Sequence, residues 1–222
     1  MHSHLITGID DGAKTIEETL GLLKQFKELG YQKVITTPHV YQEYYPNTSD
    51  IIKEGHAKVQ VALQENEIEL EFEAAAEYYL DEHFEELLDS GDLLSFGNNH
   101  ILIEMSFFAI NPKLEEYIFN LNIKGYKPIL AHPERYLYLG KKREQFERLK
   151  DLGCLLQCNL LSFTGHYGKE VKDQALWMWK NDFVDLLGSD CHHQGHLDIL
   201  KTGLQKGTYN KILSENYINQ EI

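Results

Sequence analysis

Histidine and carboxylate side chains stand at the ends of most of the short apolar runs in this sequence. They are His2, His4, Asp11, His39, Glu77, Glu104, His132, Asp190 and His192. One histidine after a strand is usually an ordinary polar residue, but a recurrence at nearly every strand end is hard to attribute to chance. Imidazole and carboxylate groups are suitable ligands for manganese, iron or zinc. The pattern therefore predicts an enzyme with several metal ions.

Helical and strand-like segments alternate along the chain and would position these side chains. The predicted helices cover residues 15–29, 50–67, 83–88, 112–124, 140–152 and 169–181. The predicted strands cover residues 33–37, 68–75, 101–103, 128–130, 154–158 and 183–187, and one more is expected at the N-terminus. This alternation favours an α/β fold with a parallel sheet. A closed barrel would gather all strand ends on one face, whereas the alternative, an open doubly wound sheet, would gather fewer.

Composition narrows the class of protein. The 222 residues are 42% hydrophobic and 25% charged, which is enough apolar material for one domain spanning 1–222. We find no apolar run near the roughly 18 residues of a membrane span and no signal-peptide core, so we expect a cytoplasmic protein without membrane insertion. The formal net charge of −14 argues against nucleic-acid binding, which needs a basic surface.

Several short motifs follow one another in a defined order. They are HSH at 2–4, GIDDG at 8–12, TPH at 37–39, Glu77, Glu104, AHPERY at 131–136 and GSDCH at 188–192. Together they resemble the polymerase-and-histidinol-phosphatase (PHP) superfamily, and within it the bacterial capsular-polysaccharide tyrosine phosphatases. The resemblance covers about residues 1–195. The arginine in AHPERY favours this branch over the histidinol phosphatases.

The resemblance implies a PHP-type distorted (β/α)7 barrel with outer helices and three divalent metal ions, manganese first, with iron or zinc as alternatives. The implied ligand sets are His2, His4, Glu77 and Asp190; Glu77, Glu104 and His132; and Asp11, His39 and His192. Glu77 would thus bridge two ions. Three divalent ions with four carboxylates leave the pocket at a charge of about +2, which attracts a phosphate dianion.

The implied reaction is hydrolysis of phosphotyrosine on a protein by metal-activated hydroxide, without a protein nucleophile. Arg135 would bind a phosphate oxygen and balance the charge of the transition state. Asp11 and His192 would help to protonate the leaving phenolate. By resemblance, the partner is a bacterial tyrosine kinase that controls polysaccharide synthesis and export, dephosphorylated on its tyrosine-rich tail.

Two other functions stay open. The first is a PHP-type phosphoesterase acting on a small metabolite such as histidinol phosphate, or a metal nuclease, although the acidic composition weighs against the nuclease. The second is a non-catalytic domain that binds a phosphorylated partner, although such a domain has no chemical need for nine ligands.

Cysteine-dependent phosphatase chemistry is disfavoured. It needs an arginine six residues after the cysteine, and Cys154, Cys158 and Cys191 have none there. We expect these three to be buried thiols in a reducing compartment.

The resemblance also raises secondary expectations. Only Met1 precedes the HSH motif, so we expect a short first strand that holds His2 and His4 loosely. Since no arginine follows Arg148, Lys201 or Lys206 would supply a second phosphate contact.

The remaining polar and aromatic candidates have weaker signals. The aromatic residues at 41–46 either wall the pocket or anchor a loop, and Asn159 is a candidate for a polar role near the substrate. Two further histidines, His193 and His196, are not expected to be ligands. Surface or helix positions are expected for His56, His83, His100 and His166.

Overall fold

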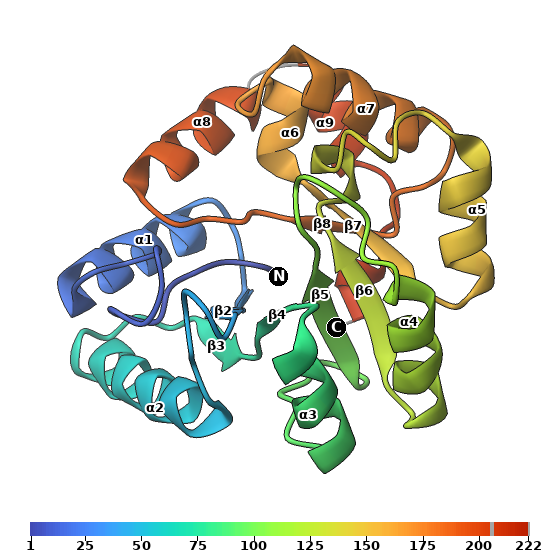
Figure 1. The fold of residues 1–222 in the computed structure, drawn as a ribbon. Coiled ribbons are helices and arrows are strands. Elements are labelled where there is room, and N and C mark those ends of the chain that lie inside the picture. The colour runs from blue at the N-terminus through green and yellow to red at the C-terminus, as the bar shows by residue number, and fades with distance from the viewer. Residues whose placement is uncertain (205–206, 222) are drawn as a thin grey trace.

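Helices surround a central set of parallel strands (Figure 1), and the computed structural model describes residues 1–204 and 207–221. The strands are β1 (Lys33–Thr36), β2 (His39–Val40), β3 (Glu71–Ala74), β4 (Glu77–Tyr79), β5 (His100–Glu104), β6 (Lys127–Ala131), β7 (Leu155–Asn159) and β8 (Leu186–Gly188). The α-helices are α1 (Ile16–Glu28), α2 (Ser49–Glu65), α3 (Glu82–Ser90), α4 (Leu114–Ile123), α5 (Arg143–Asp151), α6 (Leu160–Thr164), α7 (Lys169–Lys180), α8 (Gln194–Leu204) and α9 (Gly207–Leu213), with short 3-10 helices η1 (Pro133–Arg135) and η2 (Ile218–Glu221).

Two of the strands are interrupted. β1 pairs with β3, while β2 opens a second sheet in the order β2-β4-β5-β6-β7-β8. Backbone hydrogen bonds nevertheless continue across the interruption, from Ala75 N to Thr36 O (2.9 Å) and from Glu77 N to Pro38 O (3.0 Å). Pro38 lacks an N–H group and so weakens the ladder where β1 ends. β1/β2 and β3/β4 therefore act as two broken strands.

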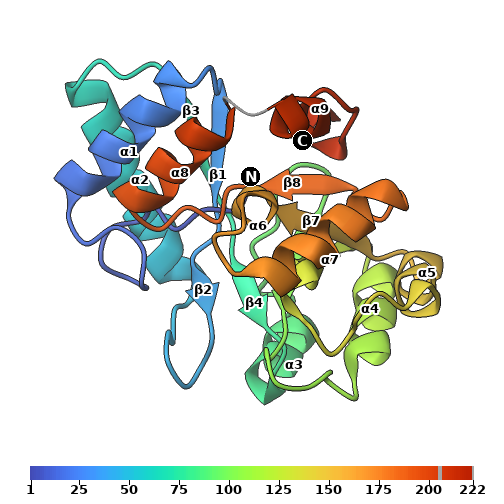
Figure 2. The ribbon, with the colours of Figure 1, turned by 90° about the horizontal axis from the view of Figure 1, so that it is seen from above.

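The N-terminal segment closes the ring between β1 and β8, as Figure 2 shows from above. The Ser3 carbonyl accepts from Thr37 N (2.7 Å), and His4 N donates to Cys191 O (2.9 Å). The ring then has seven parallel members: this segment, β1/β2, β3/β4, β5, β6, β7 and β8. The predicted α/β barrel is confirmed over the open sheet. The expected first strand is reduced to an isolated bridge between Ser3 and Cys191.

The helices begin where the sequence offers capping groups. Thr15 accepts a hydrogen bond from Glu18 N at the start of α1, and Asp81 accepts one from Phe84 N at the start of α3. Such caps satisfy N–H groups that have no partner inside the helix. Gly91 ends α3 with φ of 76°, a left-handed conformation that glycine adopts readily.

All six predicted helices and the six predicted strands after the N-terminal run are present, with ends shifted by a few residues. The sequence prediction missed β2 and β4, since two or three residues are too few to show an alternating pattern. It also missed α6 and the helices after residue 193. The expectation for His100 was wrong: it lies in β5, buried, because both faces of this strand are covered.

No helix in the described ranges combines the length and apolar character that crossing a bilayer requires.

Candidate metal centre

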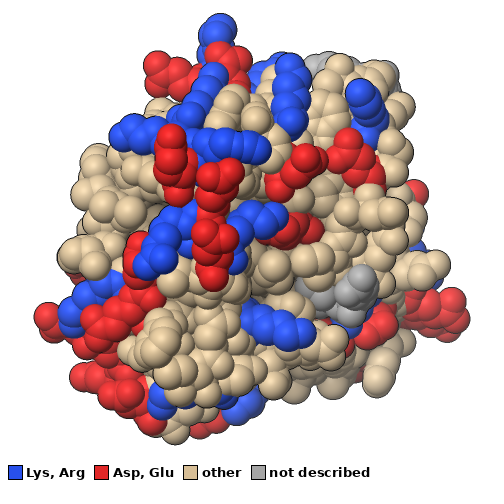
Figure 3. All heavy atoms as spheres, turned by 90° about the vertical axis from the view of Figure 1, so that its right-hand side faces the viewer, with Lys and Arg blue, Asp and Glu red and all other residues tan. Residues whose placement is uncertain are grey.

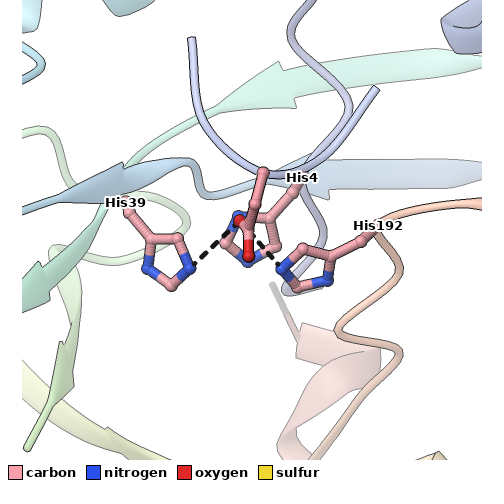
Figure 4. Close-up of side chains that lie close together, drawn as sticks. His4, His39 and His192 are labelled. Carbon is pink, nitrogen blue, oxygen red and sulfur yellow. Dashed lines mark ion pairs between the residues drawn. The ribbon is translucent and has the colours of Figure 1, made fainter. Parts of the chain in front are cut away.

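The structure brings all nine candidate ligands together at the carboxyl ends of the strands. They come from the N-terminal segment, the turn before α1, β2, β4, β5 and the residues that follow β6 and β8. Figure 4 shows three of the rings, His4, His39 and His192, turned toward one another from three different segments. Four groups have ligand atoms close enough for one ion: His4, Asp11, His39 and His192; His2, His4 and Glu77; His2, His132 and Asp190; and His39, Glu77 and Glu104.

Four of these side chains form a buried cage. Glu77 Oε2 lies 3.3 Å from His2 Nε2 and 3.5 Å from His4 Nε2, and Asp190 Oδ1 lies 3.3 and 3.4 Å from the same two nitrogens. The ligand atoms of His2, His4 and Glu77 lie within 4.8 Å of one another, as do those of His2, His132 and Asp190, separations that one metal ion can bridge. The cage therefore has the dimensions of a metal site.

Three of the atoms that face the centre of the cage have no hydrogen bond. His2 Nε2, His4 Nε2 and Glu77 Oε2 are buried without a hydrogen-bond partner among the described residues. Such groups cost about 1–3 kcal/mol each when left unsatisfied. One cation at the centre would satisfy all three, so the residues present fit a bound metal ion.

A hydrogen-bonded chain behind the cage orients His2. Its Nδ1 donates to Gln157 Oε1 (2.6 Å), Gln157 Nε2 donates to Asn159 Oδ1 (2.9 Å), and Asn159 Nδ2 donates to Asp190 Oδ2 (2.6 Å). A proton fixed on Nδ1 leaves the Nε2 lone pair for a metal. Sequence reasoning missed Gln157, and Asn159 supports a candidate ligand instead of lining the pocket.

Asp10 orients the His4 ring in the same way, by a hydrogen bond to Nδ1. Its Oδ2 accepts from His4 Nδ1 (2.7 Å), while its Oδ1 accepts from Gly12 N (2.9 Å). A Cβ atom at Gly12 would lie 2.0 Å from the His4 carbonyl oxygen, so this turn has room for glycine alone. His2 and His4 are both fully buried, and the expectation that they are loosely held was wrong because these contacts fix both rings.

Glu77 stands between the cage and a second group of ligands. Its Oε1 lies 3.0 Å from His132 Nε2, and its Oε2 lies 3.2 Å from His39 Nδ1. Glu104 completes this group, 3.5 Å from His39 Nδ1 and 3.7 Å from His132 Nε2. One carboxylate thus faces two sets of ligands, the arrangement needed for a bridge.

A third group lies at the mouth of the pocket. Asp11 Oδ1 lies 3.3 Å from His192 Nε2 and 3.6 Å from His39 Nε2, the ion pairs dashed in Figure 4. His4 stacks on His192 with ring centres 4.0 Å apart. His2, His4, His39 and Glu77 each belong to two of the four groups, whereas the sequence prediction assigned every ligand except Glu77 to one ion.

Three of the candidate ligands have left-handed backbone conformations. The φ angles are 62° at His2, 34° at His132 and 48° at Asp190. Outside glycine this conformation is uncommon and costs of order 1 kcal/mol. The hydrogen bonds of the surrounding barrel hold these residues in place, and such strain is typical of functional sites.

Electrostatics also favours a cation in this pocket. Burial alone would lower the pKa of His2, but the Glu77 and Asp190 carboxylates raise it to about 10. Burial and the Glu77 carboxylate raise the pKa of Glu104 well above its usual range. If only protein groups are present, bound protons must balance the negative charge of the clustered carboxylates. Divalent ions supply the same compensation and displace those protons.

Arg135 lies beside the cage, at the end of η1. Its Nη1 donates to Asp190 Oδ2 (3.2 Å), and its guanidinium lies between the rings of Phe107 (4.5 Å) and Tyr167 (4.4 Å). Stacking on both faces leaves the edge of the guanidinium, with its donors, for an anion. No sequence motif pointed to Phe107 or Tyr167.

Arg135, Phe107 and Tyr167 line a cavity of about 300 Å³ together with several candidate metal ligands. Its lining comprises Asp11, His39, Glu104, Phe107, His132, Arg135, Tyr167, Asp190, His192, His193 and His196. Among the described residues, Arg135 is the one Lys or Arg in this lining. Lys201 instead donates to Gln25 on α1, which places it outside the pocket, and Lys206 lies outside the described residues.

The other secondary candidates have mixed outcomes. Tyr45 stacks on His39 with ring centres 5.3 Å apart, and Tyr41 stacks on Tyr79 at 4.0 Å. The residues at 41–46 are absent from the described lining of the cavity, so they anchor the loop after β2. His193 and His196 line the cavity but belong to none of the four ligand groups found in residues 1–204 and 207–221.

All three cysteines are buried free thiols, as expected. Burial raises the pKa of Cys154 to about 12, so this thiol stays protonated and is a poor nucleophile at neutral pH.

This chain combines a closed α/β barrel with imidazole and carboxylate side chains clustered at the carboxyl end of the barrel. These two features define a class of metal-binding α/β-barrel proteins. The family described as "Capsular polysaccharide synthesis, CpsB/CapC" matches residues 1–212, and the chain belongs to this family. The resemblance inferred from the motifs is thereby confirmed.

The relatives of the chain include characterised and solved proteins. Tyrosine-protein phosphatase YwqE of Bacillus subtilis is 26% identical over 194 residues, covering 87% of this chain and 76% of the relative. Tyrosine-protein phosphatase CpsB of Streptococcus pneumoniae is 27% identical over 199 residues, covering 87% and 82%. A crystal structure from a study of these two proteins, described there as unique metal-dependent tyrosine phosphatases, aligns with a TM-score of 0.82 and 23% identity over 96% of this chain and 90% of that one, which supports the fold.

Proposed function

We propose that this protein is a metal-dependent phosphatase that hydrolyses phosphotyrosine on a protein substrate. The observation that carries the proposal is the buried cage in which three facing atoms have no hydrogen-bond partner among the described residues, beside an arginine that lines the same cavity. The names of the relatives support the choice of phosphotyrosine.

Three divalent ions, most favourably manganese with iron or zinc as alternatives, fit the donor set. Imidazole nitrogens and carboxylate oxygens without thiolates suit these metals. We assign His2, His4, Glu77 and Asp190 to the first, Glu77, Glu104 and His132 to the second, and Asp11, His39 and His192 to the third. When bound, such ions supply Lewis acidity and an activated water for attack on phosphorus.

The side chains at the mouth handle the substrate and the proton. Arg135 binds a non-bridging phosphate oxygen through the edge of its guanidinium and balances the charge that develops there. Asp11 is half-exposed and paired with His192, so this pair is placed to pass a proton to the leaving phenolate.

The substrate we propose is a tyrosine-phosphorylated protein, with a bacterial tyrosine kinase of polysaccharide export as the partner, in the cytoplasm. The family's description supports this assignment. The proposal also takes residues 1–222 as one domain, since the helices pack around a single ring of strands. A small-metabolite phosphoesterase and a non-catalytic binding domain are less favoured, because the relatives are named tyrosine phosphatases.

Phosphate release tests the proposal. The purified protein is assayed with manganese or with chelator on a phosphotyrosine peptide and on histidinol phosphate, beside elemental analysis. We expect metal-dependent release from the peptide. Release from histidinol phosphate alone would indicate a small-metabolite phosphatase instead. Metal-loaded protein that is inactive on both substrates would refute the proposal.

A further inference from the structure

Four consecutive apolar residues, 107–110, lie exposed in the loop between β5 and α4. Phe107 is 42% exposed, Phe108 94% and Ile110 50%, and Ala109 is also exposed. Exposed runs of this kind are unfavourable in water and mark interaction surfaces when they persist in a native protein.

Hydrogen bonds hold this loop in a defined turn. Phe108 N donates to Ser106 Oγ (3.2 Å), and Tyr138 Oη donates to the Ser106 carbonyl (2.8 Å). At its far end, Asn111 Nδ2 donates to the Leu80 carbonyl (2.7 Å). The apolar run between these anchors is therefore presented on the surface in a fixed place.

The run is continuous with the wall of the metal pocket. Phe107 lines the cavity, lies over the Arg135 guanidinium and stacks on His132 with ring centres 5.7 Å apart. The Phe108 Cα atom follows about 3.8 Å further along the chain. A phosphorylated side chain that reaches Arg135 therefore brings its neighbouring residues to this rim.

Charge favours a protein substrate as the occupant. Residues 105–112 contain no charged side chain, whereas the whole chain carries −14. Two copies of so acidic a chain repel each other, and so do this chain and an anionic membrane. A phosphorylated peptide is also anionic, but its phosphate is drawn to the pocket while the neutral rim imposes no repulsion on the flanking residues.

We infer that residues 107–110 form a docking surface for apolar side chains next to the phosphotyrosine of a protein substrate, with Phe108 as the main contact. This inference rests on the proposed function. An exposed aromatic ring loses little conformational entropy when it is covered and buries a large apolar area, as at other binding hot spots.

The test compares wild type, Phe108→Ala and the control Phe119→Ala, which removes another exposed phenylalanine (57%) from α4. Each is assayed on two phosphotyrosine peptides, one with leucine and one with serine beside the phosphotyrosine, and on para-nitrophenyl phosphate. Binding of a phosphonate analogue of the leucine peptide, which is not hydrolysed, is measured by fluorescence anisotropy.

We expect wild type and Phe119→Ala to prefer the leucine peptide in KM by about tenfold, and Phe108→Ala to lose this preference. Turnover of para-nitrophenyl phosphate should be equal in all three. Equal KM values for both peptides in wild type, or a preference retained by Phe108→Ala, would overturn the inference.

A lower mass for Phe108→Ala than for wild type in light scattering would instead assign the surface to a second copy of the chain, and vesicle binding lost only in that variant would assign it to a membrane. If neither peptide is hydrolysed, the proposed function fails. The phosphonate binding comparison then decides the docking surface separately, because tenfold weaker binding by Phe108→Ala alone supports it and equal binding refutes it.

Discussion

Among the described residues, Glu77 forms more ion pairs with other candidate ligands than any other member of the set. One of its oxygens faces His2, His4 and His39, and the other faces His132. A carboxylate in this position couples the sites, since its removal takes a ligand and a negative charge from both. The consequences of a substitution here should exceed those at ligands with a single partner.

We expect Glu77→Gln to lose at least one metal ion per chain and to abolish phosphatase turnover, because the amide keeps the volume but not the charge that attracts the ions. Elemental analysis after dialysis measures the loss. Glu71→Gln, an exposed glutamate on β3, is the matched control. Full metal content in Glu77→Gln would refute the bridging role.

A substitution at Arg135 tests whether substrate binding can be separated from metal binding. Arg135→Lys keeps the positive charge but loses the planar fork that stacks between Phe107 and Tyr167. We expect KM for a phosphotyrosine peptide to rise by about tenfold or more, with unchanged metal content. Arg148→Lys, at an exposed pair with Glu115, makes the same substitution elsewhere. Unchanged KM in Arg135→Lys would exclude Arg135 from phosphate binding.

At the scale of elements, the turn before α1 shows how the local backbone conformation positions a candidate ligand, His4. Residues 10–12 bend back on His4, and Asp10 bonds both the His4 ring and the Gly12 amide. The GIDDG motif therefore supplies the candidate ligand Asp11, a partner for His4 and the only residue type that fits beneath the His4 carbonyl.

Gly12→Ala should destabilise the fold by about 1–3 kcal/mol and weaken metal binding, because the new methyl group displaces His4. Gly21→Ala is the control, since its Cβ would meet nothing within 4 Å inside α1, and alanine there should add up to about 1 kcal/mol of stability. Urea unfolding and metal titration measure both. Equal stability of Gly12→Ala and wild type would show that the turn tolerates a side chain.

At the scale of the molecule, charge is dispersed over the surface and concentrated in the site. On the face shown in Figure 3, Lys and Arg side chains lie among Asp and Glu side chains. Exposed ion pairs such as Arg148 with Glu115 (2.6 Å) and Lys113 with Glu85 (2.5 Å) also join surface charges of opposite sign. Three carboxylates of the metal centre, those of Glu77, Glu104 and Asp190, are buried instead, so the ions they attract should stabilise the whole barrel.

We expect manganese at about 100 times its dissociation constant to stabilise the folded protein by about 2.7 kcal/mol and to raise Tm by about 5–10 °C. The ligands join the N-terminal segment to the ends of β2, β4, β5, β6 and β8, so an ion ties together segments distant in sequence. Thermal unfolding with manganese and with chelator measures the shift. The same Tm in both would contradict a resident metal centre.

The sequence by itself determined the nine ligand candidates, Arg135 and most of the helices and strands before residue 190, because these depend on local spacing and on motifs of adjacent residues. It could not locate β2 and β4, whose patterns are too short. Only the tertiary structure decided how the N-terminal segment closes the barrel, how Gln157 reaches His2 and how Phe107 and Tyr167 enclose Arg135. Each of these contacts joins residues far apart in the chain, and their meeting depends on the path of the whole backbone, which local patterns do not encode.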